Sequence, residues 1–175
     1  MGLVMNLLFY ISGAVAVLAT VLVVTRTNAV HALLYLIVSL LAVALIFFLL
    51  GAPFVAALEV IIYAGAIMVL FIFVIMMLNL GGEAGRQETQ WLAPGIWRGP
   101  AILCAVLAIE LVYVSITGHA RTAGAAPLPP KQVGVALFGP YVLGVELASM
   151  LLLAGLVGAY HLGRQDHRDR QNEGR

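Results

Sequence analysis

Long apolar segments, separated by short polar or glycine-rich breaks, make up most of this chain. The hydrocarbon core of a bilayer is about 30 Å thick, and a helix needs about 20 apolar residues to cross it. Five segments of the 175-residue chain meet this requirement, at approximately residues 3–24, 30–50, 54–80, 96–118 and 140–162. The segments lack the alternation of barrel strands, and a helix satisfies all of its own backbone hydrogen bonds in lipid. The sequence therefore predicts an all-α integral membrane protein with five transmembrane helices.

The breaks between these segments indicate the domain organisation. The first three segments follow one another closely, with turns at residues 26–28 and 51–53, whereas a glycine-rich polar stretch at 81–94 precedes the fourth. Residues 118–139 join the fourth to the fifth, and the run Pro-Leu-Pro-Pro at 127–130 is expected to be extended rather than helical. We therefore expect one five-helix transmembrane domain over residues 1–163 and a polar tail over 164–175.

Composition supports the membrane assignment. The chain is 63% hydrophobic and 10% charged, with a mean hydropathy of +1.07, whereas soluble domains are about 45–50% apolar and about a quarter charged. The first charged residue is Arg26, so the first segment lacks the basic start of a cleavable signal and is expected to remain as a helix. The formal net charge of +1 gives no indication of nucleic acid binding.

Basic residues predict the orientation of the five spans. Loops on the cytoplasmic side carry an excess of lysine and arginine. With the N-terminus outside, only Arg121 and Lys131 would lie outside. Seven arginines would lie inside: Arg26, Arg86, Arg98, Arg164, Arg168, Arg170 and Arg175. The sequence thus predicts a multi-pass protein of the cell inner membrane with its N-terminus outside and its tail in the cytoplasm.

Cysteine usage limits the redox chemistry that the chain can carry by itself. Its one cysteine, Cys104, lies in an apolar segment. A single cysteine excludes a disulfide framework, a cysteine-ligated zinc site and an iron–sulfur cluster built from this chain alone. We predict no catalytic, cofactor-binding or metal-ligating residue here, and any redox centre is expected in a partner.

Three glutamates, Glu59, Glu110 and Glu146, fall within predicted spans. A carboxylate near the bilayer centre costs about 2.5–3.5 kcal/mol on insertion scales, so such residues need a local reason to be there. On the predicted orientation all three lie in the outer half of the membrane. Each can be a neutral hydrogen-bonded contact between helices, or part of a proton pathway.

The neighbours of these acids differ. Glu59 has Tyr63 one helical turn further along, where the phenol can donate to the carboxylate or pass a hydrogen bond onward. The Glu59 carboxyl is expected to be largely protonated at neutral pH, because a low dielectric disfavours the charged form. Glu110 shares a helix face with Tyr113 and Thr117, and this polar stripe is expected to face protein or water rather than lipid.

Small residues indicate where helices pack closely. Ser12, Ala16 and Thr20 recur every four residues on the first span, and Ala154 and Gly158 do so on the fifth. Several such faces on a chain with little soluble mass favour a subunit of a larger membrane assembly. The chain also lacks the inverted repeat and the interrupted helix pair of a transporter.

Gly65 interrupts the third span, together with Tyr63 before it and Ala66 after it. A glycine inside a helix costs about 1 kcal/mol relative to alanine. Spacing alone leaves two readings: a position where another helix packs closely, which is the commoner case, or a π-bulge.

Two stretches of the chain resemble a known family. Residues 63–79, YAGAIMVLFIFVIMMLN, resemble the signature third helix of the J chain of bacterial NADH:quinone oxidoreductase, respiratory complex I, whose mitochondrial counterpart is the sixth membrane-encoded subunit. Residues 134–159 are similar to the last helix of that family, including Tyr141 and the Glu-Leu-Ala-Ser run that begins at Glu146. Together the two stretches cover about a quarter of the chain.

The resemblance implies a function. It implies a non-redox membrane subunit of a proton-pumping NADH:quinone oxidoreductase, a translocase of the respiratory chain. NADH, FMN, iron–sulfur clusters and quinone would lie in partner subunits. The chain would pack between the quinone-site subunit and the antiporter-like subunits, near the small A-type and K-type subunits. The third helix would carry a π-bulge at Tyr63, Gly65 and Ala66 and gate the proton and water relay that Tyr63 lines.

Two of the three acids have no role that the resemblance implies. Glu59 precedes the family motif, so its place in the relay rests on the physical argument alone, and Glu110 is not aligned with a family position. The sequence is also compatible with two other functions. One is a small subunit of a multisubunit cation/proton antiporter or membrane-bound hydrogenase, and the other is a purely structural spacer.

Overall fold

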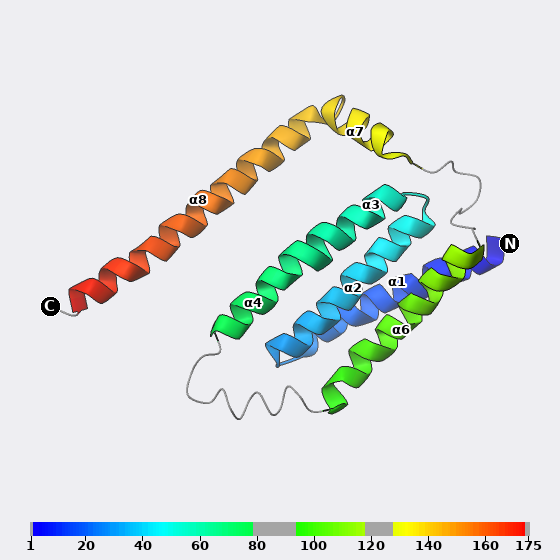
Figure 1. Cartoon of the computed structure of the whole chain (residues 1–175), viewed down its shortest axis with the longest axis horizontal. Coiled ribbons are helices and arrows are strands. Elements are labelled where there is room, and N and C mark those ends of the chain that lie inside the picture. Colours follow the sequence, from blue (N-terminus) through cyan, green and yellow to red (C-terminus); the bar gives the residue numbers. More distant parts are fainter. Residues whose placement is uncertain (1, 79–93, 118–127, 174–175) are drawn as a thin grey trace. The chain divides into compact units, whose positions relative to one another are not determined.

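The computed structural model of the chain describes residues 2–78, 94–117 and 128–173, and every regular element in this part is a helix (Figure 1). Five of these helices are long and apolar enough to cross a membrane. They contain the spans Leu3–Thr25, Ala29–Leu49, Pro53–Ile75, Trp97–Thr117 and Val142–Gly163. The predicted all-α membrane protein with five transmembrane helices is therefore confirmed.

The third span is composite, whereas the others consist of one long helix each. The first span lies in α1 (Gly2–Thr25), the second in α2 (Ala29–Leu49) and the fourth in α6 (Pro94–Thr117). The third consists of α3 (Pro53–Leu58), the π-helix η1 (Glu59–Ile67) and α4 (Met68–Leu78). The fifth lies in α8 (Val142–Glu173), which follows a shorter helix, α7 (Pro130–Phe138).

Local signals explain where the first helices begin and end. The Asn28 side chain caps α2, because its Oδ1 accepts from the backbone N–H groups of Val30 (3.0 Å) and His31 (3.2 Å). After α2, Gly51 has a φ of 82°, a left-handed conformation that favours glycine. Pro53 follows at the start of α3, where its missing N–H is not needed. The turn predicted at residues 51–53 is thus confirmed.

The chain divides into two compact units, Met1–Pro129 and Pro130–Arg175. In the first unit α2 is the central helix, since it contacts α1, α6 and all three parts of the third span (Figure 1). The core lies between α1, α2 and α6, and its largest fully buried apolar side chains are Leu49, Val38 and Val114. In the second unit α7 contacts α8.

The small-residue face of α1 packs closely, as expected, and its partner at Ala16 and Thr20 is α2. The Ser39 hydroxyl of α2 donates to the backbone oxygen of Ala16 (3.2 Å) and lies 2.8 Å from the Thr20 hydroxyl. Ser12 on the same face is fully buried. Such contacts require a close approach of the two backbones, which small side chains permit.

The connection before the fifth span differs in part from the expectation. Leu128 and Pro129 are not helical, as predicted, but Pro130 is the first residue of α7, so the extended prediction is wrong there. Proline is favoured at the first position of a helix, where its fixed φ suits the helix. Pro127 lies outside the described residues. At the other end, α8 continues to Glu173, so the backbone of the polar tail is helical through most of its length.

Candidate functional site

The third span contains the predicted departure from α-helical geometry. Residues Glu59–Ile67 form the π-helix η1, in which backbone bonds reach five residues back. At its end the N–H of Met68 is directed at the backbone oxygens of both Tyr63 and Gly65. The π-bulge predicted for this helix is therefore confirmed, and it is longer than a single extra residue. π-Helical turns are rare and frequently occur at functional sites.

All four residues proposed for the relay and gate lie in η1. Glu59 is its first residue, and Tyr63, Gly65 and Ala66 follow within it. None of its nine residues, all of them described, is buried in this chain, and the Tyr63 side chain is 48% exposed. The side chains of η1 are therefore accessible to lipid, water or other subunits.

Gly65 suits the π-helical backbone. A Cβ added there would lie 3.2 Å from the backbone oxygen of Val60, five residues earlier. This is tighter than ordinary van der Waals contact, and a β-branched side chain at the same position would crowd the oxygen further. Gly65 therefore relates to the geometry of its own helix rather than to a close approach by another described helix.

Glu59 and Tyr63 are near in sequence, but no hydrogen bond joins their side chains in the part of the chain that the structure describes. Both carry groups that exchange protons or hydrogen bonds. Their polar atoms are thus available to water or to groups from outside the chain.

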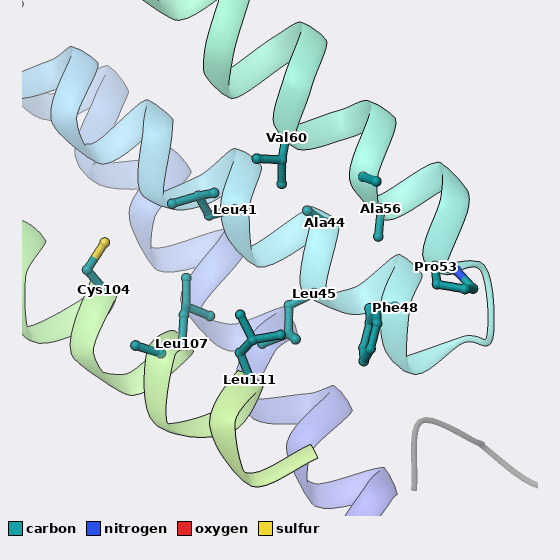
Figure 2. Close-up of a pocket in the computed structure, with 12 residues that line it drawn as sticks. Leu41, Ala44, Leu45, Phe48, Pro53, Ala56, Val60, Cys104, Leu107 and Leu111 are labelled. Atoms are coloured by element: carbon teal, nitrogen blue, oxygen red, sulfur yellow. The ribbon is translucent and has the colours of Figure 1, made fainter. Parts of the chain in front are cut away.

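A hollow of about 420 Å³, here called the α2/α6 hollow, lies beside the start of η1 (Figure 2). Its walls are apolar side chains of α2, α3, η1 and α6, among them Leu45, Val60 and Leu107. Val60 is the residue that follows Glu59, so η1 forms part of the wall. Cys104 of α6 also lines the hollow and is exposed. The π-helix therefore has free volume directly beside it.

Glu110 occupies a different place, between α6 and α1. Its side chain is only 4% exposed, and its Oε2 accepts a hydrogen bond of 2.7 Å from the Ser12 hydroxyl. Its Oε1 is also buried and has no hydrogen-bond partner among the described residues. The expectation that Glu110 faces protein rather than lipid agrees with this burial.

A second hollow, of about 470 Å³ and here called the α1/α6 hollow, adjoins this acid. Glu110 and Tyr113 line it on α6, and Tyr113 is 44% exposed. Its other walls are apolar residues of both helices: Val4, Leu8, Ile11, Val106 and Ile109. Thr117, the third member of the predicted polar stripe, donates instead to the Tyr113 backbone oxygen at 2.7 Å.

The third acid, Glu146, lies near the start of α8 in the second unit and is exposed. Its backbone oxygen accepts from the Ser149 hydroxyl (2.8 Å). The structure thus brings the η1 residues together on one helix, places Glu110 and Tyr113 on another, and leaves Glu146 in a separate unit.

Sequence reasoning missed two contacts. The small-residue pattern indicates only close packing for Ser12, although on the predicted orientation its depth matches that of Glu110, which is a signal for pairing. The sequence pattern does not single out Tyr35, which is 3% exposed; its ring lies 5.0 Å from that of His31, and its hydroxyl occupies the space that a Cβ at Gly99 would need. That contact joins the first half of α2 to the start of α6.

Within the described ranges no group of three or more histidine, cysteine, aspartate or glutamate side chains comes close enough to hold a metal ion. The carboxyl, phenol and hydroxyl groups of Glu59, Glu110, Tyr63 and Ser12 are able to exchange hydrogen bonds.

Comparison with known proteins identifies the family. The family model for NADH-ubiquinone/plastoquinone oxidoreductase chain 6 matches residues 19–162. NADH-quinone oxidoreductase subunit J of Escherichia coli K12 is 59% identical over 162 residues, which are 93% of this chain and 88% of the relative. The subunit J of Pseudomonas aeruginosa is 60% identical over 163 residues (93% and 98%), and that of Rhodobacter capsulatus is 37% identical over 171 (94% and 85%). The chain therefore belongs to the subunit J family of NADH-quinone oxidoreductase, and is a membrane-arm subunit of respiratory complex I.

Proposed function

We propose that this chain gates proton translocation in complex I, and that the third span is the moving part. The observation that carries the proposal is the π-helix at Glu59–Ile67, which lies beside the α2/α6 hollow. Membership of the family makes other membrane subunits of complex I its partners. Within that assembly we place it between the quinone-site subunit and the antiporter-like subunits, next to the small A-type and K-type subunits, in the cell inner membrane.

The physical basis is the change of register between a π-helix and an α-helix. Each residue advances an α-helix by about 100°. Loss of one π-type insertion in η1 would therefore turn α4 by about that angle relative to α3 and move it along its axis by about 1.5 Å. Side chains at the end of η1 would then point in different directions around the helix axis. A relay that depends on one of them would open or close.

The surroundings of the third span permit such a turn. Every residue of α4, sequence MVLFIFVIMML, is apolar, so α4 presents apolar side chains to α2 and to lipid in any rotational position. No residue of η1 is buried against the other described helices, and the α2/α6 hollow provides volume next to Val60. Rotation would move one buried side chain of α4, Met68, which is 4% exposed, but it would not disturb the core between α1, α2 and α6.

Tyr63 and Glu59 are the groups that we propose for the relay. The Tyr63 hydroxyl donates and accepts hydrogen bonds, and the Glu59 carboxyl can hold a proton. Since the described residues give neither side chain a partner, water or a neighbouring subunit would complete the path. The chain would contribute no redox centre, and NADH, FMN, iron–sulfur clusters and quinone would bind to partner subunits.

Two substitutions test the gate in the assembled complex. Tyr63→Phe removes the phenol oxygen, and Gly65→Val crowds the Val60 oxygen that the π-helix passes. A hydrogen bond of about 1 kcal/mol lost from a limiting step slows it about fivefold. We expect NADH-driven proton pumping to fall by at least this factor in Tyr63→Phe and further in Gly65→Val.

Two matched substitutions on α1 serve as controls. Tyr10 is 72% exposed, and a Cβ at Gly13 would have nothing within 4 Å, so Tyr10→Phe and Gly13→Val should pump normally. Quinone reduction and the amount of assembled complex are measured in the same membranes. Normal pumping and quinone reduction in fully assembled Tyr63→Phe and Gly65→Val complexes would contradict the gate and leave a structural spacer as the function.

A further inference from the structure

The α1/α6 hollow carries an inference that is independent of the gate, because it rests only on the chain being a subunit of a membrane assembly. The hollow holds about 470 Å³ between α1 and α6. Its walls are apolar except for Glu110 and Tyr113 on one side. Among the residues that line the hollow, Glu110 is the buried carboxyl side chain, and only one of its two oxygens has a hydrogen-bond partner among the described residues.

The hydrogen bonds of Glu110 are incomplete within the described residues. Ser12 donates to Oε2, whereas Oε1 has no hydrogen-bond partner in the same part of the chain. The last torsion of a glutamate side chain has a broad energy profile. A small turn of the carboxyl group therefore presents an oxygen to the hollow while the other still accepts from Ser12.

Three classes of occupant differ in what they offer this oxygen. A lipid tail fills an apolar hollow but cannot hydrogen-bond. Water needs two to four polar partners in such a site; the lining offers two polar side chains, Glu110 and Tyr113, and water would leave the apolar walls uncovered. A transmembrane helix from another subunit fills the apolar part with its own side chains and can bring a polar group to the acid.

We propose that the α1/α6 hollow seats a transmembrane helix of another complex I subunit, and that this helix bears a hydroxyl or amide side chain that hydrogen-bonds to Glu110. Such a side chain both donates and accepts, so it completes the carboxyl group in either protonation state. The rest of the docked surface is apolar, to match Val4, Leu8, Ile11, Val106 and Ile109.

Substitutions at Glu110 test the chemistry of the partner. Glu110→Gln keeps an oxygen for Ser12 and a group for a hydroxyl or amide, whereas Glu110→Leu keeps neither. Each variant competes with tagged wild-type chain for incorporation into complex I, at equal abundance in the membrane. We expect Glu110→Gln to compete equally and Glu110→Leu to lose by roughly three- to eighteenfold, which corresponds to the range measured for hydrogen bonds between membrane helices.

Substitutions beside the acid test the shape of the site. Ile109 lines the hollow and is 69% exposed, whereas Val112, also on α6 and 55% exposed, does not line it. Ile109→Trp should lower incorporation severalfold, and the matched Val112→Trp should not. The abundance of each variant in membranes that lack the other subunits checks that the chain itself still inserts and folds.

A photo-cross-linking amino acid in place of Ile109 identifies the neighbour in the intact complex. The proposal predicts cross-links to a transmembrane segment of another subunit with a hydroxyl or amide residue at the point of attachment. Cross-links to lipid alone, or equal incorporation of Glu110→Leu and wild type, would overturn it. If Glu110→Gln lowered incorporation as much as Glu110→Leu, the proposed hydroxyl or amide partner would be overturned, because such a result indicates a cationic side chain that needs the carboxylate charge.

Discussion

Glu110 shows at the residue scale how an acid is held inside a membrane protein. It is the one carboxyl side chain that is buried among the described residues, and Ser12 lies on the neighbouring helix at hydrogen-bond distance. A buried polar group that loses its partner costs about 1–3 kcal/mol, more than the hydrogen bond itself contributes. The Ser12 hydroxyl therefore matters chiefly because its loss would leave Glu110 without any partner from the chain.

A double-mutant cycle on these two residues measures that dependence. Ser12→Ala should destabilise the purified chain by about 1–3 kcal/mol in SDS unfolding, since both carboxyl oxygens of Glu110 are then unsatisfied. The combination with Glu110→Leu should reveal a coupling free energy of about 0.6–1.7 kcal/mol. Ser149→Ala is the control: its hydroxyl is exposed and bonds only within its own helix, so the change should stay within about 0.5 kcal/mol. A coupling of zero would show that the two side chains do not interact.

At the scale of elements, the contact between α2 and α6 depends on Gly99, which has no side chain. The Tyr35 ring is buried, and its hydroxyl lies where a Cβ of Gly99 would be. The guanidinium carbon of Arg26 lies 5.8 Å from the centre of the same ring, within the range of a cation–π contact. This end of the helix pair is thus closely packed, in contrast to the hollows along its length.

Gly99→Ala should therefore destabilise the chain, by about 1–3 kcal/mol for an overpacked site. The addition of Tyr35→Phe removes the overlapping oxygen, so the double variant should recover part of this loss. Thermal unfolding in detergent measures both effects. If the double variant were less stable than Gly99→Ala by the full cost of Tyr35→Phe alone, the overlap would not be the cause.

The elements also show which parts of the structure the sequence can predict. The five spans follow from apolar length, because lipid permits few alternatives to a helix. The pairing of Ser12 with Glu110 does not follow, because it requires knowing which helix faces meet, and helices that are apolar on all sides carry little information on this. From spacing alone, Gly65 is compatible with close helix packing or with a π-bulge, and only the resemblance to a family favours the π-bulge that the structure contains. Pro130 differs from the extended prediction because proline is also favoured at the first position of a helix, so a run of prolines does not show where the next helix begins.

At the scale of the whole molecule, the described spans have the surface of a protein that is covered by lipid or by other subunits. Large apolar side chains are exposed along the described spans, such as Leu3, Val24 and Ile116, each at least 80% exposed. In the third span the described buried residues are Ala56 and Met68. Apolar surfaces of this extent require lipid or other proteins to cover them, in keeping with a place among the membrane subunits of complex I.

The orientation of the molecule remains a prediction from its arginines and has a direct test. A fluorescent protein fused after residue 175 should fluoresce, because it would fold in the cytoplasm, whereas alkaline phosphatase at the same point should be inactive. Fusion of the phosphatase within residues 118–127, on the opposite side in the prediction, is the control and should be active. The reverse pattern would place the N-terminus inside and move Glu59 and Glu110 to the inner half of the membrane.

The uniform composition of α4 has a thermodynamic consequence for the proposed gate. When Met68–Leu78 turns about its axis, one apolar side chain replaces another against α2 and against lipid. Little apolar surface enters or leaves water, so the transition should have almost no heat-capacity change. Its two states would then keep nearly constant enthalpy and entropy differences as the temperature changes, and the backbone hydrogen bonds of η1 would set their balance.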